Sequence, residues 1–223
     1  MNKIVVRINI PMKFPSWIIQ EAKELRTFDF SQFETVEASK YSSLMPYQIG
    51  LVNFVWDSYL KGPKLIYDLS AHIGVDTTNF ALKYPEAQII AVELDKKVCG
   101  ILKKNMAGYE NVEVRCSDAL IEAKKIKKAD LVYLDPPWGG PEYNKKDKIV
   151  LEYSKKPVSG LIANLLGEVD VIALKAPFNY DEEELLRPLA GKKVKITQYG
   201  IKKPKKTKKG DIAFYLIIFT HSI

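Results

Sequence analysis

Residues 135–141 read Asp-Pro-Pro-Trp-Gly-Gly-Pro and follow directly on the apolar run Leu131–Leu134. The apolar run predicts a buried strand. Two successive prolines must end that strand, because proline has no N–H donor and a fixed φ angle. The chain therefore turns at the carboxyl end of the strand, which is the edge where open α/β sheets bind ligands. A Pro-rich surface turn is the alternative interpretation, but an acidic residue, two prolines and an aromatic residue directly after a strand form a rarer combination.

The composition is that of a soluble globular protein. The chain has 223 residues, of which 47% are hydrophobic and 27% charged, so it fits one α/β domain with a short extension. Its formal net charge of +7 favours a polyanionic partner without naming one. The first residues alternate between apolar and polar side chains and lack the apolar core of a signal peptide. The longest apolar run, Ile212–Phe219, is too short to span a membrane and predicts a strand.

The two cysteines, Cys99 and Cys116, form neither a Cys-x-x-Cys pair nor a metal-binding spacing. We expect both to be reduced and structural, as in the cytoplasm or the nucleus, and the sequence does not distinguish between these two compartments. His72 and His221 are the only histidines, so we expect no metal site. We also expect no membrane contact, and a monomer.

From residue 64 onward, segments with the pattern of strands alternate with segments of helical pattern. Strands are expected at Leu65–Leu69, Gln88–Glu93, Val112–Cys116, Leu131–Leu134 and Val169–Leu174. Helices are expected at 47–60, Asp76–Lys83, Lys96–Ala107, Asp118–Lys125, Pro157–Gly167 and Asp181–Ala190. The alternation predicts a parallel sheet covered on both faces, which is closed by an antiparallel hairpin of Lys192–Gln198 and Ile212–Phe219. We expect an N-terminal accessory segment (1–45) before the main domain (46–223).

Residues 135–138 resemble the Asp/Asn-Pro-Pro-aromatic signature of S-adenosylmethionine (SAM) dependent methyltransferases that modify exocyclic amines. The longer string at 136–143, Pro-Pro-Trp-Gly-Gly-Pro-Glu-Tyr, is similar to the Pro-Pro-Trp-Gly-Gly-Pro-Asp-Tyr of the trimethylguanosine synthase family, which methylates N2 of the 7-methylguanosine cap of RNA. The resemblance covers residues 40–180. It implies an α/β fold of the Rossmann-like class I SAM-dependent methyltransferase type, with a seven-stranded sheet, a C-terminal antiparallel hairpin and a small N-terminal extension.

The resemblance gives the residues of the turn a chemical role. The exocyclic amine of a nucleobase is a poor nucleophile, because its lone pair is delocalised into the ring. Asp135 and the carbonyl of Pro136 would be the catalytic groups, which accept the two amine hydrogens and aim the nitrogen at the methyl group. Trp138 would stack on the base, and cation–π attraction of about 2 kcal/mol would favour cationic 7-methylguanine over guanine. Trp17 and Trp56 are interpreted as packing residues.

The loop at 68–76 stands at the place of the family's glycine-rich cofactor loop. It reads Asp-Leu-Ser-Ala-His-Ile-Gly-Val-Asp where the family has Asp-Ala-Phe-Cys-Gly-Val-Gly-Gly-Asn. The resemblance implies that Asp68 and Gly74 bind SAM. His72 and Val75 stand at two of the family's glycine positions, where a side chain could crowd the loop or prevent a positive φ angle. We interpret His72 as a filler rather than a catalyst.

Acidic residues after the second and third expected strands are the other candidate cofactor contacts. Glu93 would hold the ribose hydroxyls, as an acid at that position does in nucleotide-binding sheets. Asp95 is the second choice for that role, or a helix cap. Ser117 and Asp118 resemble the family's adenine-reading site, although Asp118 could instead cap the following helix. Asp135 would also contact the cofactor.

Three residues after the fifth expected strand, Lys175, Phe178 and Asn179, are assigned to the substrate. The family has Pro-Arg-Asn here, with the arginine on the cap phosphates, whereas this chain has Pro-Phe-Asn. Phe178 would form a second aromatic wall for the base or pack under the hairpin. The missing cation would come from Lys175, from Lys13 or from the lysines at 202–209. We expect those lysines in an exposed, mobile hairpin loop that captures RNA, and a nuclear import signal or a merely solvated loop fits the same run.

The sequence therefore predicts transfer of one or two methyl groups from SAM to the N2 amine of a 7-methylguanosine cap, with capped RNA as the partner. Methylation of another exocyclic amine, in tRNA, rRNA or DNA, stays open because the same signature serves those reactions. A catalytically inactive cap-binding protein stays open because the glycine loop is altered. The family has serine at the position of Asp135, so the sequence leaves the number of methyl transfers undetermined.

Overall fold

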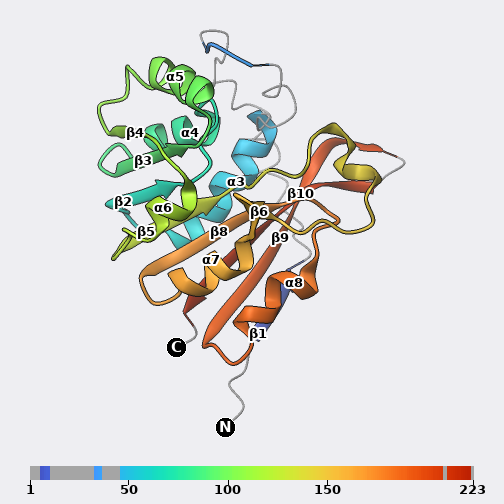
Figure 1. Cartoon of the computed structure of the whole chain (residues 1–223). Helices are drawn as coiled ribbons and strands as arrows, with labels where there is room; N and C mark the ends of the chain where they lie inside the picture. The colour runs from blue at the N-terminus through green and yellow to red at the C-terminus, as the bar shows by residue number, and fades with distance from the viewer. Residues whose placement is uncertain (1–5, 11–32, 37–45, 208–209, 222–223) are drawn as a thin grey trace.

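The computed structural model describes residues 6–10, 33–36, 46–207 and 210–221 of the chain (Figure 1). The strands are β1 (Val6–Ile10), β2 (Leu65–Asp68), β3 (Gln88–Glu93), β4 (Val112–Cys116), β5 (Ala129–Leu134), β6 (Glu152–Tyr153), β7 (Lys156–Pro157), β8 (Val169–Ala176), β9 (Val194–Thr207) and β10 (Gly210–His221). The helices are α3 (Pro46–Tyr59), α4 (Val75–Lys83), α5 (Lys96–Asn105), α6 (Ala119–Ala123), α7 (Val158–Leu165) and α8 (Glu182–Leu186), with 3-10 helices η2 (Pro141–Lys145) and η3 (Arg187–Leu189). The strands and helices expected from residue 46 onward are all present.

The large sheet has the strand order β1-β9-β10-β8-β5-β2-β3-β4. Strands β2, β3, β4, β5 and β8 pair in parallel, and β9 and β10 form the expected antiparallel hairpin beside β8. These seven strands confirm the seven-stranded class I arrangement. Strand β1 adds an eighth, parallel to β9, with Val6 beside Lys195. Part of the N-terminal extension therefore joins the sheet, and most of the rest of residues 1–45 lies outside the described residues.

Strand β9 is longer than the sequence pattern predicts. The expectation of a loop was wrong for residues 202–207, because pairing with β10 continues there, with Lys202 opposite Ile212 and Thr207 opposite Gly210. Two register shifts interrupt this part of the ladder. Backbone hydrogen bonds do not depend on side-chain polarity, so a lysine-rich run does not by itself end a strand. Lys208 and Lys209 lie outside the described residues.

Helices cover both faces of the sheet, with α6, α7 and α8 on the side facing the viewer in Figure 1 and α3, α4 and α5 on the other. Successive residues of the central strand β5 pack alternately into the two layers, as the period of two requires. Val132 and Leu134 belong to one buried cluster, and Leu131 and Tyr133 belong to the other. Trp56 is fully buried in the second cluster, so it has the predicted packing role.

The order of the strands reverses at β2, with β3 and β4 on one side and β5 and β8 on the other. Open α/β sheets bind ligands outside the carboxyl ends of the strands at such a switch point. The loop after β2 and the turn after β5 meet there. The Leu69 N–H donates to the Tyr133 carbonyl at 3.1 Å, and the Asp135 N–H donates to Ser70 Oγ at 2.6 Å. The fold thus places the two motifs with the strongest sequence signals side by side.

A disulfide joins Cys99 in α5 to Cys116 at the end of β4, with the two Cα atoms 5.6 Å apart. The expectation that both cysteines are reduced was therefore wrong. The β3–α5–β4 crossover packs α5 beside the end of β4, and the spacing of the cysteines along the chain does not reveal this. Cys99 is buried, whereas Cys116 is exposed.

We expect the Cys116→Ser variant to have a free energy of unfolding about 2–4 kcal/mol below that of the wild type under oxidising conditions, because the bridge restricts the unfolded chain. Urea unfolding followed by circular dichroism measures the difference. A reductant should lower the wild-type midpoint to that of the variant and leave the variant unchanged. Equal wild-type midpoints with and without reductant would contradict this expectation.

Candidate active site

The turn after β5 has the sharp bend that its sequence predicts. Gly139 and Gly140 have positive φ angles of 92° and 78°, which glycine adopts without strain. Pro136 is buried, and Trp138 is partly buried. The indole packs edge-on against Tyr143, with 5.2 Å between the ring centroids. Trp138 therefore lies at the rim of the core, beside the carboxyl ends of the strands.

A buried ion pair joins this turn to β8. Tyr133 lies opposite Ala173 in the parallel pair of β5 and β8, so the period of two places Asp135 and Lys175 on the same face of the sheet. Lys175 Nζ lies 2.7 Å from Asp135 Oδ2 and 3.8 Å from Asp76 Oδ2. Only 3% of Lys175 is exposed. A contact of Lys175 with cap phosphates stays a prediction, and the structure shows its ammonium group paired with two carboxylates.

Three largely buried carboxyl groups surround this ammonium group, and their pKa values reflect the crowding. Burial, reinforced by the charge of Asp76, raises the pKa of Asp68 to about 7. Burial also raises the pKa of Asp135 to about 6, although Lys175 acts in the opposite direction. Burial alone would lower the pKa of Lys175, but the charges of Asp135 and Asp76 raise it. The cluster holds more negative than positive groups, so a bound cation would stabilise it.

The cofactor loop keeps its bend although histidine replaces one of the family's glycines. His72 has a φ angle of 50° and Gly74 one of 100°. A residue other than glycine in this left-handed region costs roughly 1–2 kcal/mol. The His72 N–H donates to Glu93 Oε2 at 3.0 Å, and Thr77 Oγ1 donates to Asp68 Oδ2 at 2.7 Å. One hydrogen bond therefore holds the middle of the loop against β3, and the other joins its two ends.

Glu93 ends β3 with its carboxylate against the cofactor loop. Burial raises the pKa of Glu93, and its Oε1 accepts a hydrogen bond from the Asp95 N–H at 2.8 Å. Asp95 caps α5, because its Oδ1 accepts from the N–H groups of Lys97 and Val98. The helix-cap interpretation of Asp95 therefore describes its contacts here. Cofactor binding by Glu93 and Asp95 stays a prediction.

Ser117 and Asp118 follow β4 beside Glu93. The Ser117 N–H donates to the Glu93 carbonyl at 3.0 Å. Asp118 caps α6, with its Oδ1 accepting from the Leu120 N–H at 2.7 Å, and its Oδ2 accepts from Ser154 Oγ. A contact between Asp118 and adenine stays a prediction, and it would have to share the carboxylate with these two donors.

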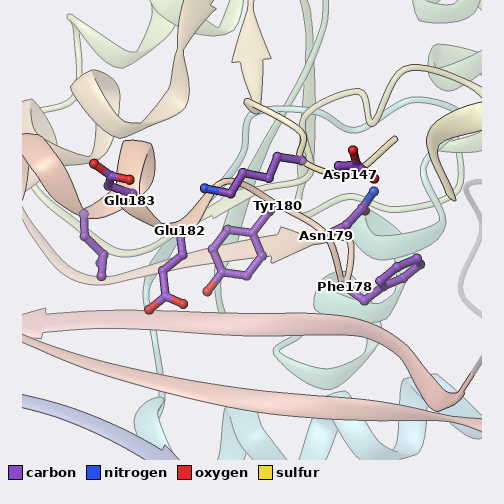
Figure 2. Close-up of a pocket in the computed structure, with 8 residues that line it drawn as sticks. Asp147, Phe178, Asn179, Tyr180, Glu182 and Glu183 are labelled. Carbon is purple, nitrogen blue, oxygen red and sulfur yellow. The ribbon is translucent and has the colours of Figure 1, made fainter. Parts of the chain in front are cut away.

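Phe178 and Asn179 line a groove of about 580 Å³ beside α8 (Figure 2). Phe178 is 38% exposed, and its ring centroid lies 6.3 Å from that of Tyr143. Asn179 Nδ2 donates to the Tyr143 carbonyl at 3.0 Å. Tyr143 thus stands between Trp138 and Phe178 in a row of aromatic rings. Figure 2 shows Phe178 at one end of the groove and Glu182 and Glu183 at the other. The remaining lining residues are Asp147, Lys148, Tyr180 and Leu186.

Most predicted site residues meet at the carboxyl edge of the sheet: Asp68, Gly74, Glu93, Asp95, Ser117, Asp118, Asp135, Pro136, Trp138 and Lys175. Lys13 lies outside the described residues. Sequence reasoning missed Ser70, Asp76 and Tyr153, whose side chains contact this edge. Asp76 could have been found from the sequence, because an acidic residue stands at a position where the family has asparagine. Tyr153 gave none, since it follows the signature turn by many residues without a motif of its own.

A family model described as RNA cap guanine-N2 methyltransferase matches residues 63–221, which include the predicted site residues from Asp68 to Asn179. The chain belongs to the RNA cap guanine-N2 methyltransferase family. It is similar to the trimethylguanosine synthase of Saccharomyces cerevisiae, with 26% identity over 144 residues, or 61% of this chain and 45% of the yeast protein. It is 30% identical over 147 residues to uncharacterized protein L320 of Acanthamoeba polyphaga mimivirus, or 62% of this chain and 55% of that protein. The chain thus spans about half the length of these two relatives.

Solved structures share the fold of this cap methyltransferase family member. The METTL16 MTase domain aligns with a TM-score of 0.55 at 14% identity, over 95% of this chain and 82% of that domain. A SAM-dependent methyltransferase from Agrobacterium tumefaciens aligns with a TM-score of 0.56 at 15% identity, over 81% of this chain and 63% of the other. These likenesses confirm the class I SAM-dependent methyltransferase fold. Together with the family, they identify SAM as the cofactor.

The residues at the carboxyl edge suit SAM. SAM carries positive charge on its sulfonium and amino groups, and the carboxyl groups of Asp68, Asp76 and Asp135 outnumber the one ammonium group of Lys175 that is paired with them. Glu93, at the end of β3, is the residue that would hold the ribose hydroxyls. The charge and the donor set of the site therefore fit the cofactor that the family implies.

No cluster of histidine, cysteine and acidic side chains in the residues that the structure describes has the arrangement of a metal site. None of the helices in the described ranges is long and apolar enough to cross a membrane.

We expect Gly74→Ala to lower the free energy of unfolding by about 2 kcal/mol or more, because the left-handed backbone and a crowded Cβ position act together. A Cβ atom at Gly74 would lie 2.6 Å from Met106 Cε and 2.9 Å from Leu102 Cδ1. Gly100→Ala is the matched control, since a Cβ there meets nothing within 4 Å and alanine favours the helix by about 0.5–1 kcal/mol. Urea unfolding compares the variants, and equal stability of the two would show that Gly74 is not required.

We expect the affinity for SAM to rise about tenfold between pH 5.5 and pH 7.5, a change of the size that one shifted ionisation gives. The pKa values of Asp68 and Asp135 are about 7 and about 6, so both groups lose their protons in this range and then attract the cationic cofactor. S-adenosylhomocysteine, which lacks the sulfonium charge, should show a smaller rise. Calorimetric titrations across the range measure both ligands, and parallel pH profiles would contradict this assignment of the charge.

Proposed function

We propose that the chain transfers methyl groups from SAM to the exocyclic N2 amine of the 7-methylguanosine cap of RNA. The observation that carries the proposal is the contact between the signature turn and the cofactor loop, in which the Asp135 N–H donates to Ser70 Oγ at 2.6 Å. This contact supports the proposal because an amine held at residues 135–138 would lie next to a cofactor held at residues 68–76. The family to which the chain belongs supports the same substrate.

Asp135 is the group that we assign to the amine. Lys175 takes one oxygen of its carboxylate, Oδ2, at 2.7 Å, and the other oxygen and the carbonyl of Pro136 are the acceptors for the two amine hydrogens. Holding both hydrogens directs the nitrogen lone pair out of the purine ring plane. SAM supplies the electrophilic methyl group when bound. Alignment of a nucleophile with its target can contribute roughly 7–11 kcal/mol in well-oriented systems.

Trp138 is the group that we assign to the base. Its indole lies beside the turn, and a cationic 7-methylguanine gains cation–π attraction on such a face. The acidic groove next to Phe178 supports a cationic base as well, since Asp147, Glu182 and Glu183 outnumber Lys148 along its wall. Lys175 Nζ also lies 5.9 Å from the Trp138 ring centroid. This ammonium group is paired with Asp135 and Asp76, so it opposes a cationic base on the indole less than an unpaired charge would.

Methylation of another exocyclic amine, in tRNA, rRNA or DNA, is the second candidate function. It is favoured by the acid at position 135, because the Asp-Pro-Pro-aromatic form of the signature serves those substrates. Capture of RNA by the lysines at 202–209 and the phosphate contact of Lys175 belong to either candidate and stay predictions.

The test incubates the protein with SAM and either 7-methyl-GTP or GTP and follows methylated guanosine by mass spectrometry. We expect the 7-methylated nucleotide to react faster in the wild type. Trp138→Ala should lower turnover of 7-methyl-GTP by about a hundredfold, the scale expected for one positioning or electrostatic group, and Trp138→Phe should lower it less. Equal transfer to both nucleotides would refute the cap preference and favour the second candidate.

Asp135→Ala requires its own control, because it leaves Lys175 buried with one close partner fewer, and breaking a buried pair typically costs about 3–5 kcal/mol. The double variant Asp135→Ala/Lys175→Met removes both charges and should recover part of the stability while turnover stays about a hundredfold low. Asp170→Ala, at the exposed opposite end of β8, should keep wild-type turnover. Wild-type turnover in the double variant would show that Asp135 does not hold the amine.

A further inference from the structure

The hairpin formed by β6 and β7 turns through two residues, Ser154 and Lys155, with positive φ angles of 48° and 63°. Such two-residue turns normally use asparagine or glycine, because the left-handed backbone conformation costs free energy for other residues. Strained backbone of this kind persists where the surrounding structure holds it, and it is concentrated at functional sites. The contacts of the hairpin therefore indicate which function this strained turn supports.

Tyr153 connects the hairpin to the signature turn. Its side chain is buried, with 8% exposed, and its hydroxyl donates to Ser70 Oγ at 3.0 Å. Ser70 Oγ in turn accepts the N–H of Asp135 at 2.6 Å. The three groups form a chain of hydrogen bonds that runs from the hairpin, through the cofactor loop, to the residue that we assign to the amine.

Ser154 and Val158 anchor the two sides of the same hairpin. Ser154 Oγ donates to Asp118 Oδ2, beside the end of β4. The Val158 N–H, at the start of α7, donates to the Leu151 carbonyl at 2.8 Å. The hairpin thus contacts the chain after β2 and after β4, and it reaches the turn after β5 through Ser70. It spans the edge of the sheet where this fold binds its cofactor.

The backbone of the signature turn offers few other ways to fix its direction. Pro136 and Pro137 have no N–H group, so the Asp135 N–H is the last backbone donor before Trp138. Its acceptor, a serine hydroxyl, sits on a side chain with three staggered rotamers. The Tyr153 hydroxyl selects the Ser70 rotamer that meets the Asp135 N–H, because one oxygen must accept both bonds.

We propose that Tyr153 is a positioning residue for the methyl transfer, which it serves by fixing, through Ser70, the backbone of Asp135 and hence the direction of the Asp-Pro-Pro-Trp turn. The inference rests on the proposed function, since the turn must hold the acceptor amine for its direction to affect the rate. Tyr153 touches neither reacting atom. Its hydroxyl acts on the turn through the hydrogen bond to Ser70 Oγ, and it also interacts with the Asp135 backbone.

The test removes the Tyr153 hydroxyl alone, with Tyr153→Phe, and measures kcat on 7-methyl-GTP, the dissociation constant of SAM, and the exchange rate of the Asp135 amide by NMR. We expect kcat to fall about tenfold, the scale of one neutral hydrogen bond, with SAM affinity within about twofold and faster exchange at Asp135. Ser70→Ala should have the same effects, and the double variant should add little, because both changes break one path. Tyr109→Phe, at the opposite end of β4, is the hydroxyl control and should match the wild type.

Two outcomes overturn the inference. A Tyr153→Phe variant with a lower melting temperature but wild-type kcat and wild-type Asp135 exchange would show that Tyr153 is a packing residue only. Additive losses in the double variant would show that Tyr153 and Ser70 act separately. If the wild type methylates no guanosine acceptor, the proposed function is wrong, and the Asp135 exchange rate alone then decides whether Tyr153 fixes the turn.

Discussion

The buried ion pair between Lys175 and Asp135 is the interaction on which the site depends. Lys175 is only 3% exposed, and an ammonium group on such a buried residue is tolerated only with a close counter-charge, since an unpaired buried charge costs several kcal/mol. The parallel register of β5 and β8 supplies that partner. The pair ties the signature turn to the neighbouring strand, and the hydrogen bond from the Asp135 N–H to Ser70 ties it to the cofactor loop. The turn is therefore fixed from both sides.

One ammonium group does not balance the carboxyl groups gathered around it. Burial raises the pKa of Asp68 to about 7 and that of Asp135 to about 6. Ionisation of these groups therefore lowers the stability of the folded protein. A ligand with positive charge removes part of this cost. The site therefore favours a cationic ligand even before the ligand binds, and this preference does not depend on any single contact with the ligand.

The sequence predicted those parts of the site that depend on the order of the strands. It did not predict the contacts that depend on the register between two paired strands. Asp68, Glu93 and Asp135 each end a strand of a parallel sheet, so their meeting at one edge followed from the fold class. The pairing of Lys175 with Asp135 required the relative register of two strands that lie 40 residues apart. The predictions for the two cysteines and for the length of β9 were wrong for a related reason. The packing of α5 beside β4 and the pairing of β9 with β10 cannot be predicted from local periodicity in the sequence. Tyr153 reaches Ser70 across 83 residues.

The departures of this chain from its family are coupled in space. Asp76 stands where the family has asparagine and Asp135 where it has serine, and the ammonium group of Lys175 lies between their carboxylates. Ser70 stands where the family has phenylalanine, and its hydroxyl accepts from both Asp135 and Tyr153. Asp76 and Asp135 share the charge of one buried lysine, and Ser70 supplies the acceptor for two buried donors, so these groups satisfy one another. Together these residues fix the turn that follows β5. Replacing one of them with the family's residue would therefore remove a contact of a buried polar group and lower stability, and the loss would be smaller if the contacting residue were replaced as well.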